Sequence, residues 1–129
     1  MRGASQVFRS ARIRALNDAF RSDIDNATTA IHESVIEMFG RIGLPALIEG
    51  VRTFDAFTPD DDDHHDNGAF SVFGVTVMWA IQYADLAMKG PSPNPADPHV
   101  TKRVLVLALA DAIADEGDSR TPAGPVLRP

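Results

Sequence analysis

The segment from Gly68 to Tyr83 alternates apolar and polar residues on both sides of the dipeptide Phe73-Gly74. If this dipeptide is a two-residue turn, Val72 pairs with Val75 and the large apolar side chains share one face: Phe70, Val72, Val75, Val77, Trp79, Ile81 and Tyr83. A period of two with one apolar face is typical of an antiparallel hairpin packed on a core. Phenylalanine suits the first position of a type I′ turn poorly, so a bulge at the turn is a second possibility.

Three other segments are predicted to be helices. Residues 8–21 and 44–54 carry apolar side chains at helical spacing, and Pro45 stands in the first turn of the second segment. Asp97 and Pro98 resemble an N-cap and first helical residue, which predicts a helix over 97–116. Its middle, VLVLALA, is apolar nearly all round, so this helix should be the central buried one.

The predicted fold class is therefore α+β. A small antiparallel sheet, made of the hairpin 68–84 and a third strand near residues 28–33, packs against about three helices. At 129 residues the chain has room for one modest core. We expect a single domain over residues 1–116, followed by a proline-rich tail over 117–129.

Composition excludes several classes of protein. The chain has no cysteine, which rules out disulfides, thiolate zinc sites and thiol catalysis. No apolar run approaches the length of a membrane span, and the arginines near the N-terminus are not followed by the apolar stretch of a secretory signal. A cytoplasmic location without membrane contact is the expectation.

Charge is unevenly distributed along the chain. The formal net charge is −6, yet residues 1–22 carry five arginines against one aspartate, a local +4. Residues 55–66 carry six aspartates and no basic residue apart from two histidines. An acidic surface repels phosphate, so we expect no direct binding of nucleic acid and favour a protein partner with a basic surface. The arginines of the first helix are expected to form a solvated face.

The acidic loop FTPDDDDHHDNGAF, residues 57–70, is the most chemically loaded stretch of the chain. It fails the pattern of an EF-hand, because position twelve counted from Asp63 is a glycine where that motif needs a glutamate. His65 and Asp66 remain a minor hypothesis for a divalent metal site, with His32, Glu33 and His99 as the distant candidates for a third ligand. A solvated acidic loop without any cofactor is the favoured interpretation.

No catalytic residue is predicted. The consecutive aspartates give no reason for a buried, positioned pair of carboxylates, and no serine stands on a strained strand-to-helix turn. The segment GRIG, residues 40–43, lacks the lysine of a phosphate-binding loop.

Four segments together resemble a small bacterial family, the domain of unknown function 3768: ALNDAFR (15–21), VRTFDAFTPD (51–60), HDNGAF (65–70) and SPNPADPHVTKRVL (92–105). The resemblance covers roughly residues 12–112. It implies a short cytoplasmic protein of alphaproteobacterial chromosomes and plasmids, encoded near mobile elements and without an assigned activity. The pair His65 and Asp66 matches the family pattern.

The chain also departs from that pattern. Asn67 stands where the family has an aromatic residue, and Ala80 and Gln82 replace a lysine and an aspartate of the second hairpin strand. The loss of one lysine and one carboxylate weakens an enzymatic interpretation.

The leading hypothesis is a non-enzymatic protein-binding module that occludes a basic surface, for example an anti-CRISPR or anti-restriction inhibitor of a host defence nuclease complex. The predicted contact residues are Asp60, Asp61, Asp62, Asp63 and Asp66. The arginine face with Arg9 and Arg12 would serve a second contact or a homodimer. Two alternatives stay open: a metal-dependent, hydrolase-like enzyme centred on His65 and Asp66, and an antitoxin-like partner protein.

Overall fold

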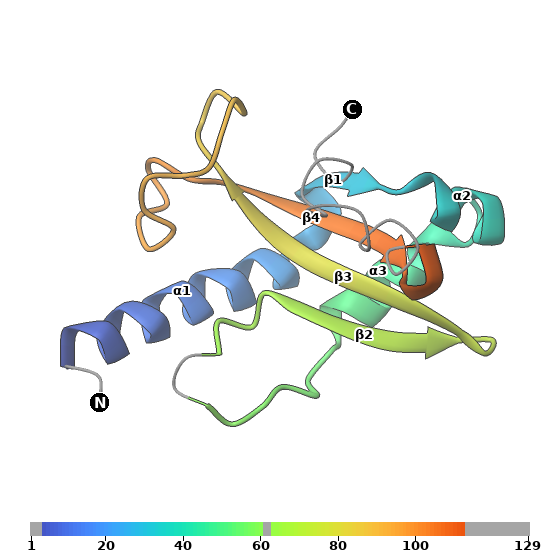
Figure 1. Ribbon diagram of the computed structural model, residues 1–129, viewed down its shortest axis with the longest axis horizontal. Coiled ribbons are helices and arrows are strands. Elements are labelled where there is room, and N and C mark those ends of the chain that lie inside the picture. Colours follow the sequence, from blue (N-terminus) through green and yellow to red (C-terminus); the bar gives the residue numbers. More distant parts are fainter. Residues whose placement is uncertain (1–3, 61–62, 113–129) are drawn as a thin grey trace.

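The computed structural model describes residues 4–60 and 63–112. Its elements, in chain order, are α1 (Ala4–Ser22), a short 3-10 helix η1 (Ile24–Asn26), β1 (Thr28–Ile31), α2 (Glu33–Phe39), α3 (Leu44–Arg52), β2 (Asn67–Val72), β3 (Val75–Ala84) and β4 (Lys102–Leu109). The four strands form one sheet in the order β1-β4-β3-β2 (Figure 1). The predicted α+β class is confirmed, and the tail predicted over 117–129 lies outside the described residues.

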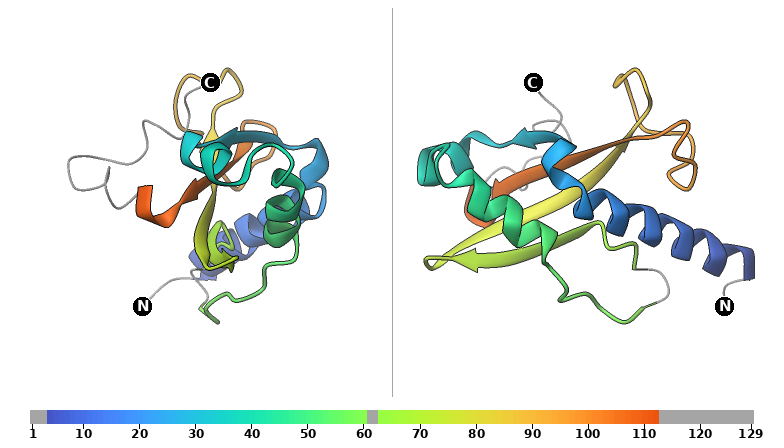
Figure 2. Two further views of the ribbon diagram at one scale, coloured as in Figure 1. Left: turned by 90° about the vertical axis from the view of Figure 1, so that its right-hand side faces the viewer. Right: turned by 180° about the vertical axis from the view of Figure 1, so that it is seen from behind.

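The sheet is mixed. β4 pairs antiparallel with β3 and parallel with β1, and β2 pairs antiparallel with β3. The third strand predicted near residues 28–33 is present, but it joins the sheet in parallel at one edge. α1 and α3 lie across the same face of the sheet, as the view from behind shows (Figure 2). The helices predicted over 8–21 and 44–54 are both confirmed as α1 and α3.

The hairpin has the register that its alternation predicts. Val72 pairs with Val75, Phe70 with Val77, and Gly68 with Trp79. Phe73 and Gly74 both have positive φ, 52° and 79°, which is the pattern of a type I′ turn. The alternative of a bulge is therefore wrong, and Phe73 takes the left-handed conformation with 94% of its surface exposed.

This turn predicts a stabilising substitution. Because asparagine adopts positive φ more readily than phenylalanine, Phe73→Asn is expected to raise the free energy of unfolding by about 1 kcal/mol. Phe73→Ala is the control, since it removes the exposed ring but keeps an unfavourable residue at this φ. Urea unfolding should therefore place the asparagine variant above both wild type and the alanine variant; equal stability of all three would contradict the turn assignment.

The helix predicted over 97–116 is wrong across most of its length, because Lys102–Leu109 is a central strand. Leu105 and Leu107 face the helices, whereas Val104 and Val106 form a second buried cluster with Ala30 on the opposite face. A strand buried on both faces is apolar at consecutive positions and loses the period of two. The predicted cap at Asp97 instead supports a turn, in which its carboxylate accepts a hydrogen bond from the backbone N–H of His99 at 2.9 Å.

The main core lies between the sheet and the helices. Trp79 on β3 is its largest fully buried side chain, and it packs edge-to-face against Phe54 with ring centroids 5.5 Å apart. Val35, Leu47 and Val51 cover the sheet from α2 and α3. In the part of the chain that the structure describes, no helix combines the length and apolarity needed to cross a membrane. The core thus leaves one long connection, from α3 to β2, on the outside of the domain.

Candidate functional site

The connection between α3 and β2 is the acidic loop, and α1 holds its second half in place. The Arg14 guanidinium donates to the carbonyl oxygen of Asp63 at 2.8 Å, and the Asn17 amide donates to that of His64 at 2.9 Å. These bonds tie residues of α1 to chain positions 47 to 49 residues away. The loop is thereby a supported part of the domain surface.

Asn17 is the central residue of this support. Its side chain is completely buried, and its amide group also donates to the Tyr83 hydroxyl at 2.8 Å. Its carbonyl oxygen accepts from Nε of Arg103 on β4 at 2.6 Å. One amide therefore connects α1 with the loop, β3 and β4, and it uses both of its N–H groups and its oxygen.

The Tyr83 hydroxyl passes this connection on to the loop, since it donates to Oδ2 of Asp66 at 2.8 Å. Burial raises the pKa of Tyr83, the hydrogen bond from Asn17 lowers it by less, and the charge of Asp66 raises it further. Tyr83 therefore keeps its proton and remains a donor. Burial lowers the pKa of Arg103, whose guanidinium lies 5.2 Å from the centre of the Tyr83 ring.

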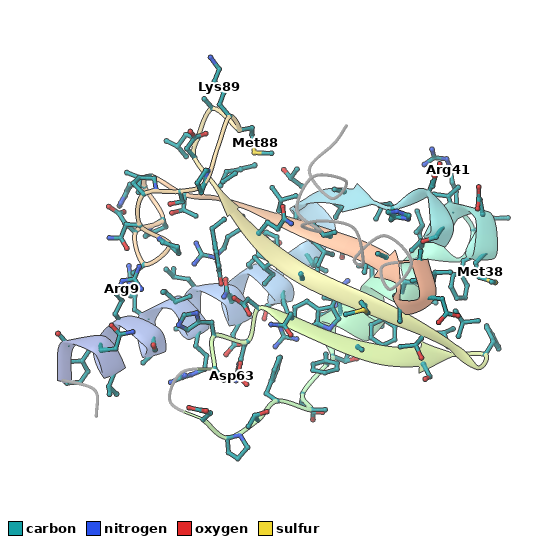
Figure 3. All side chains as sticks on the ribbon, viewed as in Figure 1. Arg9, Met38, Arg41, Asp63, Met88 and Lys89 are labelled. Atoms are coloured by element: carbon teal, nitrogen blue, oxygen red, sulfur yellow. The ribbon has the colours of Figure 1, made fainter. Side chains whose placement is uncertain are left out.

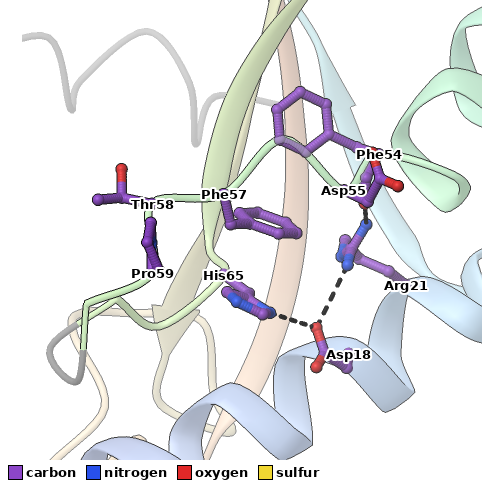
Figure 4. A pocket seen from close by; sticks show the side chains of 8 residues that line it. All are labelled: Asp18, Arg21, Phe54, Asp55, Phe57, Thr58, Pro59 and His65. Atoms are coloured by element: carbon purple, nitrogen blue, oxygen red, sulfur yellow. Dashed lines mark hydrogen bonds and ion pairs between the residues drawn. The ribbon is translucent and has the colours of Figure 1, made fainter.

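His65 points back toward α1 and not toward Asp66. Its Nδ1 lies 2.9 Å from Oδ1 of Asp18, and its ring stacks on Phe57 with centroids 3.8 Å apart and planes at 10° (Figure 4). The backbone of His65 has φ of 56°, a left-handed conformation that costs free energy for a residue with a side chain. The carboxylate of Asp63 supports it by accepting from the His65 N–H at 2.8 Å.

Arg21 lies behind this pair and is only 7% exposed. Its NH1 donates to the carbonyl oxygens of Val51 at 2.8 Å and Phe54 at 2.9 Å, at the C-terminal end of α3, where unpaired carbonyls favour a cation. Its NH2 donates to Oδ1 of Asp18 at 3.2 Å. Asp18 is therefore shared between Arg21 and His65.

The same guanidinium lies 4.9 Å from the ring centre of Phe57 and 5.4 Å from that of Trp79. Arg21 is thus a buried structural cation, and the prediction of a wholly solvated arginine face is wrong for it. Arg9 and Arg12 are exposed but reach the segment before β4, at Asn94 and Ala96, each at 3.4 Å (Figure 3).

These side chains line a pocket of about 390 Å³ between α1 and the first half of the loop. Its lining residues are Asp18, Arg21, Phe54, Asp55, Phe57, Thr58, Pro59 and His65 (Figure 4). The pocket combines two carboxylates, one imidazole and one guanidinium with three flat apolar side chains. It can bind a small polar group through charge and hydrogen bonds.

The structure divides the predicted contact residues into different environments. Asp60 is exposed, whereas Asp63 and Asp66 are half-buried and accept hydrogen bonds within the domain. Asp61 and Asp62 lie outside the described residues. Asp66 and Asp63 therefore support the loop, and of the residues described here Asp55 and Asp60 present its exposed carboxylates.

The metal hypothesis on His65 and Asp66 stays a prediction. The two side chains have different partners, Asp18 and Tyr83. Within residues 4–60 and 63–112 there is no group of three or more His, Cys, Asp or Glu side chains that fits a metal ion. His32 caps α2 by accepting from the Ser34 N–H at 3.1 Å, and His99 is exposed beside Asp97.

Sequence reasoning missed Asn17, Asp18, Arg21, Tyr83 and Arg103. The first three lie in ALNDAFR and Arg103 lies in SPNPADPHVTKRVL, two of the segments that carry the family resemblance. These segments meet HDNGAF in the folded domain, because Asp18 contacts His65 and Tyr83 links Asn17 to Asp66. The convergence of separate motifs was the signal that could have located the site.

A family model described as "Protein of unknown function (DUF3768)" matches residues 14–112. No curated protein matches the chain. No solved structure matches it either.

Proposed function

The chain belongs to the DUF3768 family of proteins of unknown function, and from this premise we propose that it is a small protein-binding module that occludes a basic surface of its partner. In its concrete form it is an inhibitor of a host defence nuclease complex, of the anti-CRISPR or anti-restriction type. An antitoxin-like partner protein would use the same surface chemistry.

The observation that supports the proposal is the bracing of the acidic loop by α1 and β3. Arg14, Asn17 and Asp18 hold residues 63–65, and Tyr83 holds Asp66. A loop that is already ordered loses little conformational entropy on binding, so more of the interaction free energy appears as affinity. The exposed carboxylates of Asp55 and Asp60 lie on this supported loop and attract a basic partner over a long range.

The test compares variants with equal loss of charge. The loop variant changes Asp60, Asp61 and Asp62 to Asn, which spares the internal hydrogen bonds of Asp63 and Asp66. The control variant changes Glu33, Glu37 and Asp111, three exposed acids elsewhere, to Gln or Asn. Both are tagged and used to capture partners from native host lysate at low and high salt, and the captured protein is then purified for direct binding.

We expect a partner that binds wild type and the control variant but binds the loop variant about tenfold more weakly, with affinity falling as salt rises. Purified partner that binds the loop variant as tightly as wild type would refute the proposal. Equal weakening in both variants would also refute it, because net charge and not the loop would then be responsible.

A further inference from the structure

The pocket beside the acidic loop offers hydrogen-bond acceptors that the fold does not use. A carboxylate only accepts hydrogen bonds, so the contact with Asp18 requires the proton of a neutral His65 ring to be on Nδ1. Nε2 then carries a lone pair, and among the described residues it has no hydrogen-bond partner. The same is true of Oδ2 of Asp18 and of both carboxylate oxygens of Asp55.

The charge balance of the lining favours a cation. The carboxylates of Asp18 and Asp55 stand against the single guanidinium of Arg21, which leaves one net negative charge. Arg21 offers little to an incoming anion, because NH1 is used by two carbonyl oxygens, NH2 donates to Asp18, and Nε is buried. The exposed acid of the neighbouring loop adds to the negative potential.

The walls of the pocket favour a flat group. Phe54, Phe57 and Pro59 line it, and Phe57 is held in place by the His65 ring. A guanidinium is planar, is weakly hydrated, stacks on flat apolar surfaces and presents five N–H donors in a fixed arrangement. An ammonium group is compact and strongly hydrated, so it gains less from such walls.

We propose that this pocket takes the guanidinium group of an arginine side chain on the partner's basic surface. His65 Nε2, the second oxygen of Asp18 and the carboxylate of Asp55 are the acceptors for its N–H groups. The inference rests on the proposed function, and it gives the charge-driven contact one defined point of recognition. The His65 conformation then has a role, since left-handed backbone and the Asp18 contact together aim Nε2 at the pocket.

The experiment uses small probes with the full chain, so it does not depend on knowing the partner. N-acetyl-arginine amide, N-acetyl-lysine amide and inorganic phosphate are each titrated into ¹⁵N-labelled protein, and amide shifts are followed. We expect saturable binding of the arginine probe with a Kd on the order of 1 mM, with shifts centred on residues 54–58 and 65. Asp55→Asn and His65→Gln should each weaken it about tenfold.

Asp60→Asn is the matched control, because Asp60 is an exposed acid of the same loop that does not line the pocket. It should change the affinity for the arginine probe by less than about twofold. Lysine amide binding as tightly as the arginine probe, phosphate binding in its place, or no saturable binding at all would each overturn the inference. Because the probe assay needs no partner, its failure and a failure of partner capture are separate results.

Discussion

Asn17→Ala is expected to lower the free energy of unfolding by about 3 kcal/mol, since removing one partner of a buried charged group is far more costly than losing an exposed hydrogen bond. The substitution removes three hydrogen bonds from the interior and leaves the guanidinium of Arg103 without its 2.6 Å acceptor. The single tryptophan, Trp79, lies in the core and reports unfolding in urea by its fluorescence.

Asn67→Ala provides the comparison for this measurement. Asn67 is exposed and its side chain donates only to Asp66, so its loss should cost less than about 0.5 kcal/mol. If the two variants have the same stability, Asn17 does not connect α1, the loop and the sheet in the way described.

Gly68→Ala is expected to destabilise the domain by about 2 kcal/mol through overpacking. A Cβ atom at this position would lie 2.7 Å from the ring carbon Cζ of Phe54 and 2.7 Å from Nε1 of Trp79. Both rings belong to the main core, so neither can move away without disturbing further contacts. Urea unfolding measures the loss, and a shifted emission of Trp79 should accompany it.

Gly90→Ala is the matched control for the close approach at Gly68. A Cβ at residue 90 would meet nothing within 4 Å, and Gly90 is not among the glycines with positive φ. Its stability should stay within about 0.5 kcal/mol of wild type. A Gly68→Ala variant as stable as Gly90→Ala would mean that Phe54 and Trp79 are not packed against β2 as described.

The hairpin was predictable because one of its faces meets the core and the other does not. The large side chains from Phe70 to Tyr83 occupy alternate positions, and this alternation sets the register almost uniquely. The turn itself was harder to predict, because Phe73 adopts a conformation that its side chain disfavours. The pairing of the strands on either side outweighs that local cost.

β4 was mispredicted for the opposite reason. Its residues are buried on both faces, so an all-round apolar run was mistaken for a central helix. The β-branched residues Val104 and Val106 and the short length of the run were the available clues to a strand. The parallel pairing with β1 joins residues 28–31 to 104–107, a separation that no local pattern encodes.

The candidate site was predicted only in part. His65 and Asp66 attracted attention as neighbours in sequence, yet the fold directs them to different partners. Asp18 meets His65 across 47 residues, because α1 runs beside the loop and His65 takes a left-handed backbone conformation. Neither the helix placement nor this backbone conformation follows from the local sequence, so the pair Asp18 and His65 could not be deduced from it.

The most direct test of this account is the tautomer of His65, because its contact with Asp18 both fixes the loop on α1 and aims Nε2 at the pocket. Long-range ¹H–¹⁵N correlation spectra of the imidazole rings distinguish a protonated Nδ1 from a protonated Nε2. At a pH where the ring is neutral, His65 should show a protonated Nδ1 and a bare Nε2, whereas Asp18→Asn should abolish this preference. A His65 ring with averaged nitrogen shifts, indistinguishable from those of exposed His99, would contradict the account.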